Sequence, residues 1–183
     1  MGWSFSYTDG KKEVIQDCLT GGESPKGFKV LAHSVVGNHL WVAFENETSE
    51  RYPVGDRFLC LYLLAGGGRN MGWGCKAISE DMGPCDVDCP LYLLDLVPAP
   101  KDSEYSANFR ARVRAFHVAK AEGRKKKANL EVGDKLMLPE GCRPSWVIIT
   151  EAGKSVRGIA DGARYRISPR YITNGTIIKK GTF

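Results

Sequence analysis

The spacing of apolar positions divides the chain into a β-rich first part, one long helix and a β-rich last part. Trp3, Phe5 and Tyr7 alternate with polar residues as in a strand, and residues 11–19 have the spacing of a short helix. Further strand-like runs occupy residues 28–36, 39–45, 58–64 and 71–78. Gly37 and Asn38 separate the first two of these runs and predict a tight hairpin turn. We therefore expect an antiparallel β-sheet with one short helix in this part of the chain.

The longest helix signal follows a Pro-Ala-Pro sequence at residues 98–100, which is the clearest boundary in the chain. Its apolar positions form one stripe at helical spacing: Tyr105, Phe109, Val113 and Phe116. Asp102 or Ser103 is the expected N-cap, and Gly123 is the expected end of the helix. Before the boundary, residues 91–96 have the pattern of either a short strand or a helical turn.

From residue 130 onward the apolar runs are short, and turns rich in Gly, Asp and Asn separate them. The expected strands are residues 135–138, 145–150, 155–159, 163–168, 171–173 and 176–180. Many short strands over so few residues are typical of a small closed or half-closed barrel of the SH3 kind. The predicted fold is therefore α+β. It has an acidic domain with an antiparallel sheet over residues 1–98, a basic connecting helix over 99–128, and a basic β-barrel-like domain over 129–183.

Charge is distributed unevenly between the two ends of the chain. Residues 1–100 hold 8 Lys and Arg against 13 Asp and Glu, whereas residues 101–183 hold 18 against 8, within an overall net charge of +5. A block of positive charge is typical of a surface that binds an anionic partner. The charge pattern thus indicates a polyanionic partner for the last part of the chain. It does not indicate any particular reaction.

The basic residues of the long helix and of the last part are the candidate nucleic-acid contacts, because Lys and Arg neutralise phosphates. These residues are Arg110, Arg112, Arg114, Lys120, Arg124, Lys125, Lys126, Lys127, Arg164, Arg166 and Arg170. Trp146, Tyr165 and Tyr171 lie among them in the sequence and could stack on bases. Two alternatives stay open: a solvated helix face, and docking onto an acidic protein, which includes the N-terminal half of this chain.

The segment from Cys75 to Pro90 gathers acids, thiols and a lysine in one loop. Lys76, Glu80 and Asp81 are the candidate catalytic residues, either around Mg²⁺ or as acid and base. The candidate zinc ligands are Cys75, Cys85 and Cys89, although their spacing matches no recognised zinc pattern. The alternative is a structural loop with packed cysteines and solvated acids. We expect no cofactor, with Zn or Mg as the alternatives.

This segment also carries a resemblance to a known group of sequences. The chain resembles a family of small phage- and plasmid-associated proteins, also found in actinobacterial and proteobacterial genomes, whose shared domain has no assigned function. The residues that carry the resemblance are Met1, Gly2, Trp3, Lys76, Glu80, Gly83, Pro84, Cys89 and Pro90, before an arginine-bearing helix at 109–114. It covers about the first 115 residues, and Cys75 stands where family members often have Tyr. The resemblance implies a mobile-element origin. Because the family has no assigned activity, it carries no catalytic role over to any residue of this chain.

The sequence has neither the pattern of a membrane span nor that of a signal peptide. No apolar run approaches the roughly 20 residues of a membrane span, and the N-terminus lacks the order of a signal peptide. We expect a protein of the host-cell cytoplasm with no membrane partner. It would be a non-enzymatic phage or plasmid protein that binds nucleic acid, or a nucleic-acid-bound host complex, to counter a defence system. The alternatives are a small metal-dependent enzyme that acts on a nucleotide or nucleic acid from the 76–89 loop, and a protein–protein inhibitor of a host defence factor.

Overall fold

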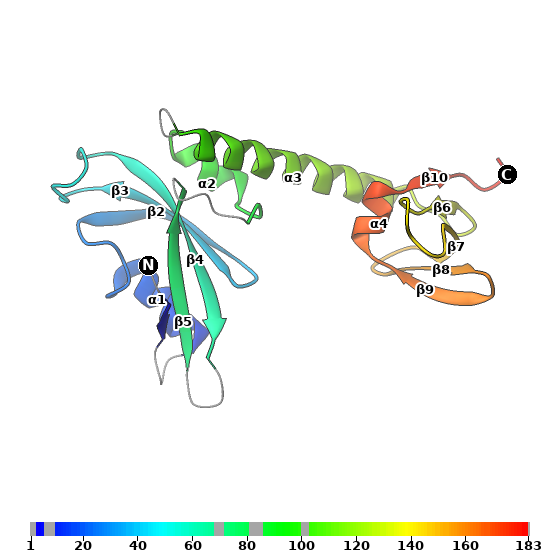
Figure 1. Ribbon diagram of the computed structural model, residues 1–183, viewed down its shortest axis with the longest axis horizontal. Coiled ribbons are helices and arrows are strands. Elements are labelled where there is room, and N and C mark those ends of the chain that lie inside the picture. Colours follow the sequence, from blue (N-terminus) through cyan, green and yellow to red (C-terminus); the bar gives the residue numbers. More distant parts are fainter. Residues whose placement is uncertain (1–2, 6–9, 68–71, 81–85, 100–102, 183) are drawn as a thin grey trace. The chain divides into compact units, whose positions relative to one another are not determined.

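The computed structural model describes residues 3–5, 10–67, 72–80, 86–99 and 103–182 (Figure 1). The chain divides into two compact units, Met1–Ala115 and Phe116–Phe183, here called the N-terminal and C-terminal units. The division falls inside the long helix α3 (Glu104–Ala128), whereas the sequence pattern placed the boundary at residues 98–100. The difference arises because the first turns of α3 pack into the core of the N-terminal unit.

The N-terminal unit contains a five-stranded antiparallel sheet. Its strands are β1 (Ser4–Phe5), β2 (Phe28–Val36), β3 (His39–Asn46), β4 (Arg57–Gly66) and β5 (Trp73–Ser79), in the order β1-β5-β4-β3-β2. Gly37 has a φ of +60° in the turn between β2 and β3, so the expected hairpin is confirmed. Tyr7, expected in the first strand, lies outside the described residues.

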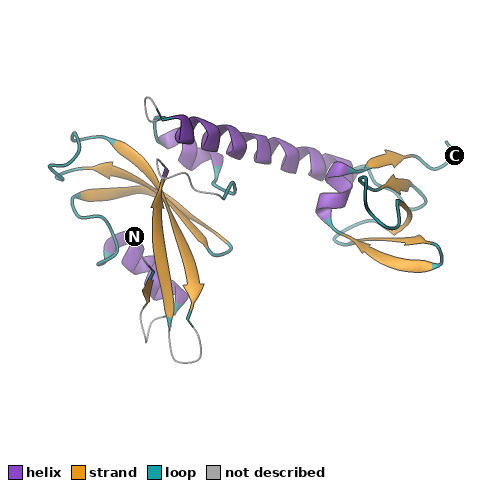
Figure 2. Cartoon of the chain, viewed as in Figure 1, coloured by secondary structure: helices purple, strands orange, loops and turns teal. Residues whose placement is uncertain are grey.

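Both faces of this sheet are covered, which explains the nearly continuous apolar runs of β3 and β4 (Figure 2). Trp41 and Leu61 belong to the face that packs on α2 (Leu91–Leu96) and on Phe109 and Val113 of α3. The residues of the opposite face pack on α1 (Lys11–Thr20). Residues 91–96 are therefore helical, one of the two alternatives left by their pattern. Ser103 is the N-terminal cap of α3, because its Oγ accepts a hydrogen bond from the backbone N–H of Ser106 at 3.2 Å.

The C-terminal unit contains a second five-stranded antiparallel sheet and one short helix. Its elements are β6 (Lys135–Met137), β7 (Trp146–Glu151), β8 (Val156–Ala160), β9 (Ala163–Ile167), α4 (Pro169–Asn174) and β10 (Thr176–Ile178). The strand order is β10-β6-β7-β8-β9, so β9 and β10 are edge strands and the sheet is open. The α+β class is confirmed, and of the two forms expected for the last part, a closed or a half-closed barrel, the closed one is wrong, because the two edge strands do not pair with each other.

Two predicted boundaries in the C-terminal unit are also wrong. Residues 171–173, expected as a strand, lie in α4, where Pro169 at the start of the helix fixes a helical φ. The helix α3 continues through Gly123 to Ala128. A Cβ at Gly123 would lie 2.2 Å from Oγ1 of Thr173, so this glycine permits close packing of α3 on α4. The cations that follow it favour the last helical turn, because the C-terminal end of a helix carries partial negative charge.

A buried carboxylate holds the start of this sheet together. Asp134 is fully buried, and its carboxylate accepts hydrogen bonds from the backbone N–H groups of Glu131 at 2.9 Å and Lys180 at 3.1 Å. The Nζ of Lys179 donates a third hydrogen bond at 3.0 Å. Burial raises the pKa of Asp134, but the hydrogen bonds from Glu131, Lys179 and Lys180 outweigh it and hold the pKa below its usual value.

Replacing Asp134 by Asn should destabilise the C-terminal unit at pH 7 by about 1–3 kcal/mol, because the charge-assisted hydrogen bonds are lost. A carboxylate with a lowered folded-state pKa contributes stability above its unfolded-state pKa of about 3.9, and loses it as pH falls through the folded-state value. The stability of D134N should therefore fall less steeply below about pH 4 than that of the wild type. Amide hydrogen exchange in β7 and β8 measures both effects, with the exposed Asp161→Asn variant as the control. Parallel pH curves for D134N and wild type would contradict this role.

Candidate nucleic-acid interface

Three hollows of the C-terminal unit are connected through shared lining residues. The central hollow, of about 330 Å³, lies where β8 begins and β9 ends. The helix-end hollow, also of about 330 Å³, shares Lys127 with it, and the tyrosine hollow, of about 390 Å³, shares Arg166 and Ile167. The central hollow is therefore adjacent to each of the other two on the surface of this unit.

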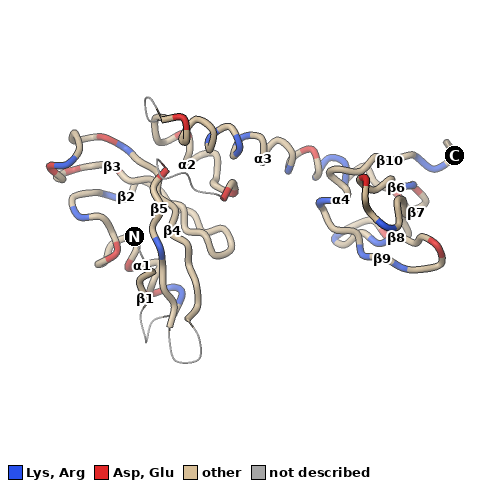
Figure 3. Tube along the Cα trace, in the orientation of Figure 1, with Lys and Arg blue, Asp and Glu red and all other residues tan. Residues whose placement is uncertain are grey.

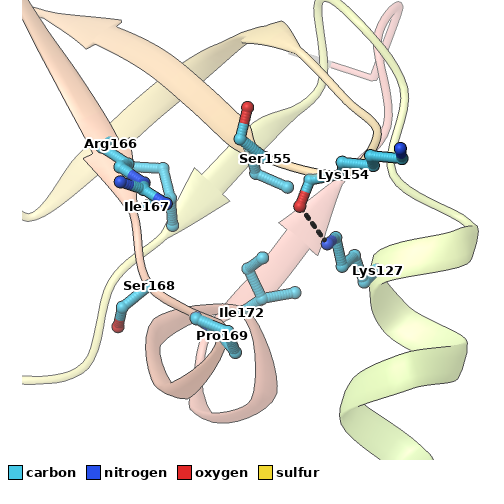
Figure 4. Close-up of a pocket in the computed structure, with 9 residues that line it drawn as sticks. Lys127, Lys154, Ser155, Arg166, Ile167, Ser168, Pro169 and Ile172 are labelled. Atoms are coloured by element: carbon cyan, nitrogen blue, oxygen red, sulfur yellow. Dashed lines mark hydrogen bonds between the residues drawn. The ribbon is translucent and has the colours of Figure 1, made fainter.

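The central hollow has an apolar base and a polar rim. Val156 and Ile167 are cross-strand partners, and together with Ile172 of α4 they are buried in the core below it. The rim carries Lys127, Lys154 and Arg166, with the hydroxyl groups of Ser155 and Ser168. Figure 4 shows Arg166 on one side of the hollow and both lysines on the other side.

The position of Lys127 is fixed by a backbone contact inside the same unit. Its Nζ donates a hydrogen bond to the carbonyl oxygen of Lys154 at 2.9 Å (Figure 4). An ammonium group has three protons, so this contact leaves donors for a ligand. Lys154 itself is exposed, and it contributes only its carbonyl oxygen to this contact. The end of α3 and the turn before β8 thus place two cations together.

The other two hollows differ in character. The helix-end hollow is lined by Arg124, Lys127, Ala128, Leu130, Ala152 and Gly153. The tyrosine hollow is lined by Leu138, Gly141, Cys142, Arg143, Pro144, Val147, Tyr165, Arg166, Ile167 and Tyr171. The helix-end hollow contributes one further cation, Arg124. The tyrosine hollow combines two arginines with aromatic and aliphatic side chains.

Taken together, the residues that line the three hollows include five cations and no Asp or Glu: Arg124, Lys127, Arg143, Lys154 and Arg166. The C-terminal unit as a whole holds 14 Lys and Arg against 6 Asp and Glu, a net charge of +8 (Figure 3). Surfaces of one charge sign around concave sites concentrate the opposite charge. This arrangement is suited to holding several phosphate groups in a row.

Arg110 was expected among the phosphate contacts, and the structure corrects this assignment. The residue is only 8% exposed, and its guanidinium forms an ion pair with Glu80, with Nη2 at 2.9 Å from Oε2. Its Nη atoms also donate to three carbonyl oxygens at the end of α2, those of Leu94, Val97 and Pro98. Arg110 therefore stabilises the N-terminal unit and has no donor left for a phosphate.

The remaining helix cations have different surroundings. Arg112 and Arg114 are exposed in the N-terminal unit, where Nη2 of Arg114 lies 3.2 Å from Oδ1 of Asp95. Lys120 is exposed, with its Nζ 5.5 Å from the centre of the Phe116 ring. None of these residues lines the three hollows of the C-terminal unit.

The basic run at residues 124–127 divides into three roles. Arg124 and Lys127 line the hollows, and Lys125 is exposed away from them. Lys126 holds α4 in place, because its Nζ donates to the carbonyl oxygens of Thr173 at 2.6 Å and Gly175 at 3.2 Å. Substituting all four residues of the run would therefore change both the lining of the hollows and the packing of α4.

Of the three predicted arginines in the sheet region, Arg166 lines two of the hollows. Arg164 and Arg170 are exposed but line none of the three. Sequence reasoning missed Arg143 and Lys154 as individual residues, because they stand alone in the sequence. The only signal for them was the general excess of cations after residue 100.

The structure describes two of the three candidate catalytic residues, Lys76 and Glu80. Glu80 is buried, and it accepts hydrogen bonds from Arg110 and from the hydroxyl of Ser106, so it is a structural partner and not an available acid or base. Lys76 lies half-buried in β5. Asp81 and Cys85 lie outside the described residues.

The zinc interpretation is also corrected where the structure describes its residues. Cys75 packs in the core on the α1 side of the sheet, whereas Cys89 packs in the core on the α2 side, so they cannot bind the same ion. Burial raises the pKa of Cys89 to about 12, which keeps it a thiol at neutral pH. Within the described ranges, no group of three His, Cys, Asp or Glu side chains has the arrangement of a metal site.

Two further results bear on partners. In the described part of the chain, no helix is both long enough and apolar enough to cross a membrane. Comparison of the chain with protein-family models, with curated proteins and with solved structures gives no match.

Proposed function

We propose that the C-terminal unit binds the phosphate backbone of a nucleic acid along the three connected hollows, and that the protein acts by binding and not by catalysis. The observation that carries the proposal is the row of five cations without an acid, connected through Lys127 and Arg166. Guanidinium and ammonium groups are the side chains that bind phosphates most often, and arginine adds two-point contacts.

The connection between the hollows favours a polymer over a small anion. A single phosphate would occupy one hollow, whereas a chain of phosphates can follow all three. The hydroxyl of Ser168 at the rim supplies a neutral donor of the kind that holds phosphate oxygens, whereas the hydroxyl of Ser155 donates its proton to Oε1 of Glu151 at 3.0 Å. We include a nucleic-acid-bound host or defence complex in the proposal, because the family that the sequence resembles comes from phages and plasmids.

The test is fluorescence anisotropy of the full chain with labelled single- and double-stranded DNA and RNA, across about 50 to 300 mM salt. Three to five phosphate contacts on a single strand should give a slope of log affinity against log salt of about −2 to −3.5. Absence of binding to every probe at the lowest salt would overturn the proposal. Binding with no salt dependence would also overturn it, because phosphate neutralisation always releases counterions.

A further inference from the structure

The tyrosine hollow has a composition that phosphate binding alone does not require. Its volume of about 390 Å³ lies in the usual range of small-ligand sites, roughly 300 to 1,000 Å³. Its lining is mainly apolar and aromatic, and the polar groups that converge on it belong mostly to Arg143 and Arg166. A phosphate gains nothing from an apolar wall, so this hollow fits a different part of the ligand.

Three separate segments build this hollow. Tyr165 comes from β9, and Tyr171 comes from α4, where the residue is 39% exposed. The loop between β6 and β7 closes the remaining side with Arg143 and Pro144. In the part of the chain that the structure describes, neither tyrosine ring stacks on another aromatic ring. Tyr165 packs partly against the core of the unit, whereas Tyr171 is exposed, so the ring of Tyr171 is available to a planar group of a ligand.

We infer that the nucleic acid is single-stranded and places one unpaired base in the tyrosine hollow, against Tyr171. The inference rests on the proposed function, and it names the ligand class of the same site. Bases of a duplex are paired and stacked inside the helix, so only an unpaired base reaches a side pocket. Aromatic side chains stack on any base, which gives affinity without sequence preference.

The position of Arg166 links the base to the backbone. This residue lines both the tyrosine hollow and the central hollow. A phosphate bound by Arg166 is therefore next to the base site, and the strand continues from there toward Lys127 and Lys154. An acidic peptide with an aromatic residue is the competing ligand class, and the experiment below includes it.

The experiment compares three probes of similar charge on the full chain at about 100 mM salt. They are a single strand of oligo-dT, a duplex of oligo-dT with oligo-dA of half that length and therefore the same number of phosphates, and an abasic oligomer that keeps the sugar-phosphate backbone. The single strand should bind about 5- to 150-fold tighter than the duplex and the abasic oligomer, because only it supplies an unpaired base. A glutamate–tyrosine copolymer serves as a competitor.

Variants at Tyr171 test the position of the base. Tyr171→Ala should remove the preference for the single strand over the abasic oligomer and leave abasic binding unchanged, whereas Tyr171→Trp should keep the preference. Tyr105→Ala is the control, because Tyr105 is 72% exposed and lies in the N-terminal unit. Amide hydrogen exchange in β8 and β9 verifies that each variant is folded.

The outcomes separate the two proposals. Equal, salt-dependent binding of all three probes, unchanged by Tyr171→Ala, would overturn the base site and leave the proposed function standing. No binding of any probe at low salt would overturn the proposed function as well. Displacement of oligo-dT by the copolymer at equal charge concentration would overturn the inference in favour of an acidic peptide.

Discussion

Replacing Glu80 by alanine should destabilise the N-terminal unit by about 3–5 kcal/mol, because one partner of a buried ion pair is removed. The carboxylate is buried, with a side-chain exposure of 3%, and its partner Arg110 has a side-chain exposure of 10%. Removing the acid leaves the guanidinium charge buried without compensation. It also removes the acceptor for the hydroxyl of Ser106, which lies in the same buried cluster.

The pair matters for the fold because it joins three elements. Glu80 directly follows β5, Arg110 lies in α3, and the carbonyl oxygens that Arg110 binds belong to Leu94, Val97 and Pro98 at the end of α2. The first turns of α3 are therefore fixed to the sheet by charge as well as by Phe109 and Val113. Loss of Glu80 should weaken this whole side of the sheet.

The measurement is the free energy of opening of amides in β3 and β4, taken from hydrogen exchange in the full chain. The matched control is Asp95→Ala, since Asp95 pairs with Arg114 at 3.2 Å but both side chains are more than half exposed, at 59% and 52%. An exposed pair of this kind contributes about 0–1 kcal/mol. A loss for Glu80→Ala no larger than that for Asp95→Ala would contradict the structural role of the buried pair.

The sequence predicted several elements correctly because local spacing determines them. The hairpin at Gly37, the cap at Ser103 and the apolar contacts of Phe109 and Val113 all follow from short-range patterns. The burial of Arg110 also follows from a short-range pattern, although the residue was predicted to be a phosphate contact. It lies one position after Phe109 and three before Val113, on the buried side of the helix, whereas its residue type grouped it with the exposed Arg112 and Arg114.

Other features depend on which distant segments pair, and local spacing does not contain that information. The short strands after residue 130 were recognisable, but their arrangement as an open sheet depends on β9 and β10 remaining unpaired with each other. The central hollow joins Lys127, Lys154 and Arg166 from three separate elements. Its members were therefore recognisable only as part of a general excess of positive charge.

Reversing the charge of Lys154 and Arg166 together should lower the affinity for single-stranded nucleic acid at least about 100-fold near 100 mM salt. Two phosphate contacts are lost and two repulsive charges are added at the connection between the hollows. The fold should persist, because both side chains are exposed and Lys127 binds only the backbone carbonyl of Lys154. Arg166 faces Arg157 across the β8–β9 pair, so a glutamate at position 166 replaces a like-charge neighbour with an opposite one.

The control for this variant has the same change in net charge at a different place. Lys12→Glu with Lys26→Glu alters two exposed lysines of the N-terminal unit, neither of which lines the three hollows. If binding depended only on the net charge of the protein, the two double variants would lose the same affinity. If the hollows hold the strand, only the Lys154 and Arg166 variant should lose most of it.

The most direct test of the account is the slope of log affinity against log salt, measured for the wild type and for both double variants with the same single strand. We predict that the Lys154→Glu, Arg166→Glu variant has a slope shallower than that of the wild type by about 1.4, since each phosphate contact on a single strand contributes about 0.7. The Lys12→Glu, Lys26→Glu variant should keep the wild-type slope. Equal slopes for the two double variants, or a wild type that does not bind, would contradict the assignment of the connected hollows as the nucleic-acid interface.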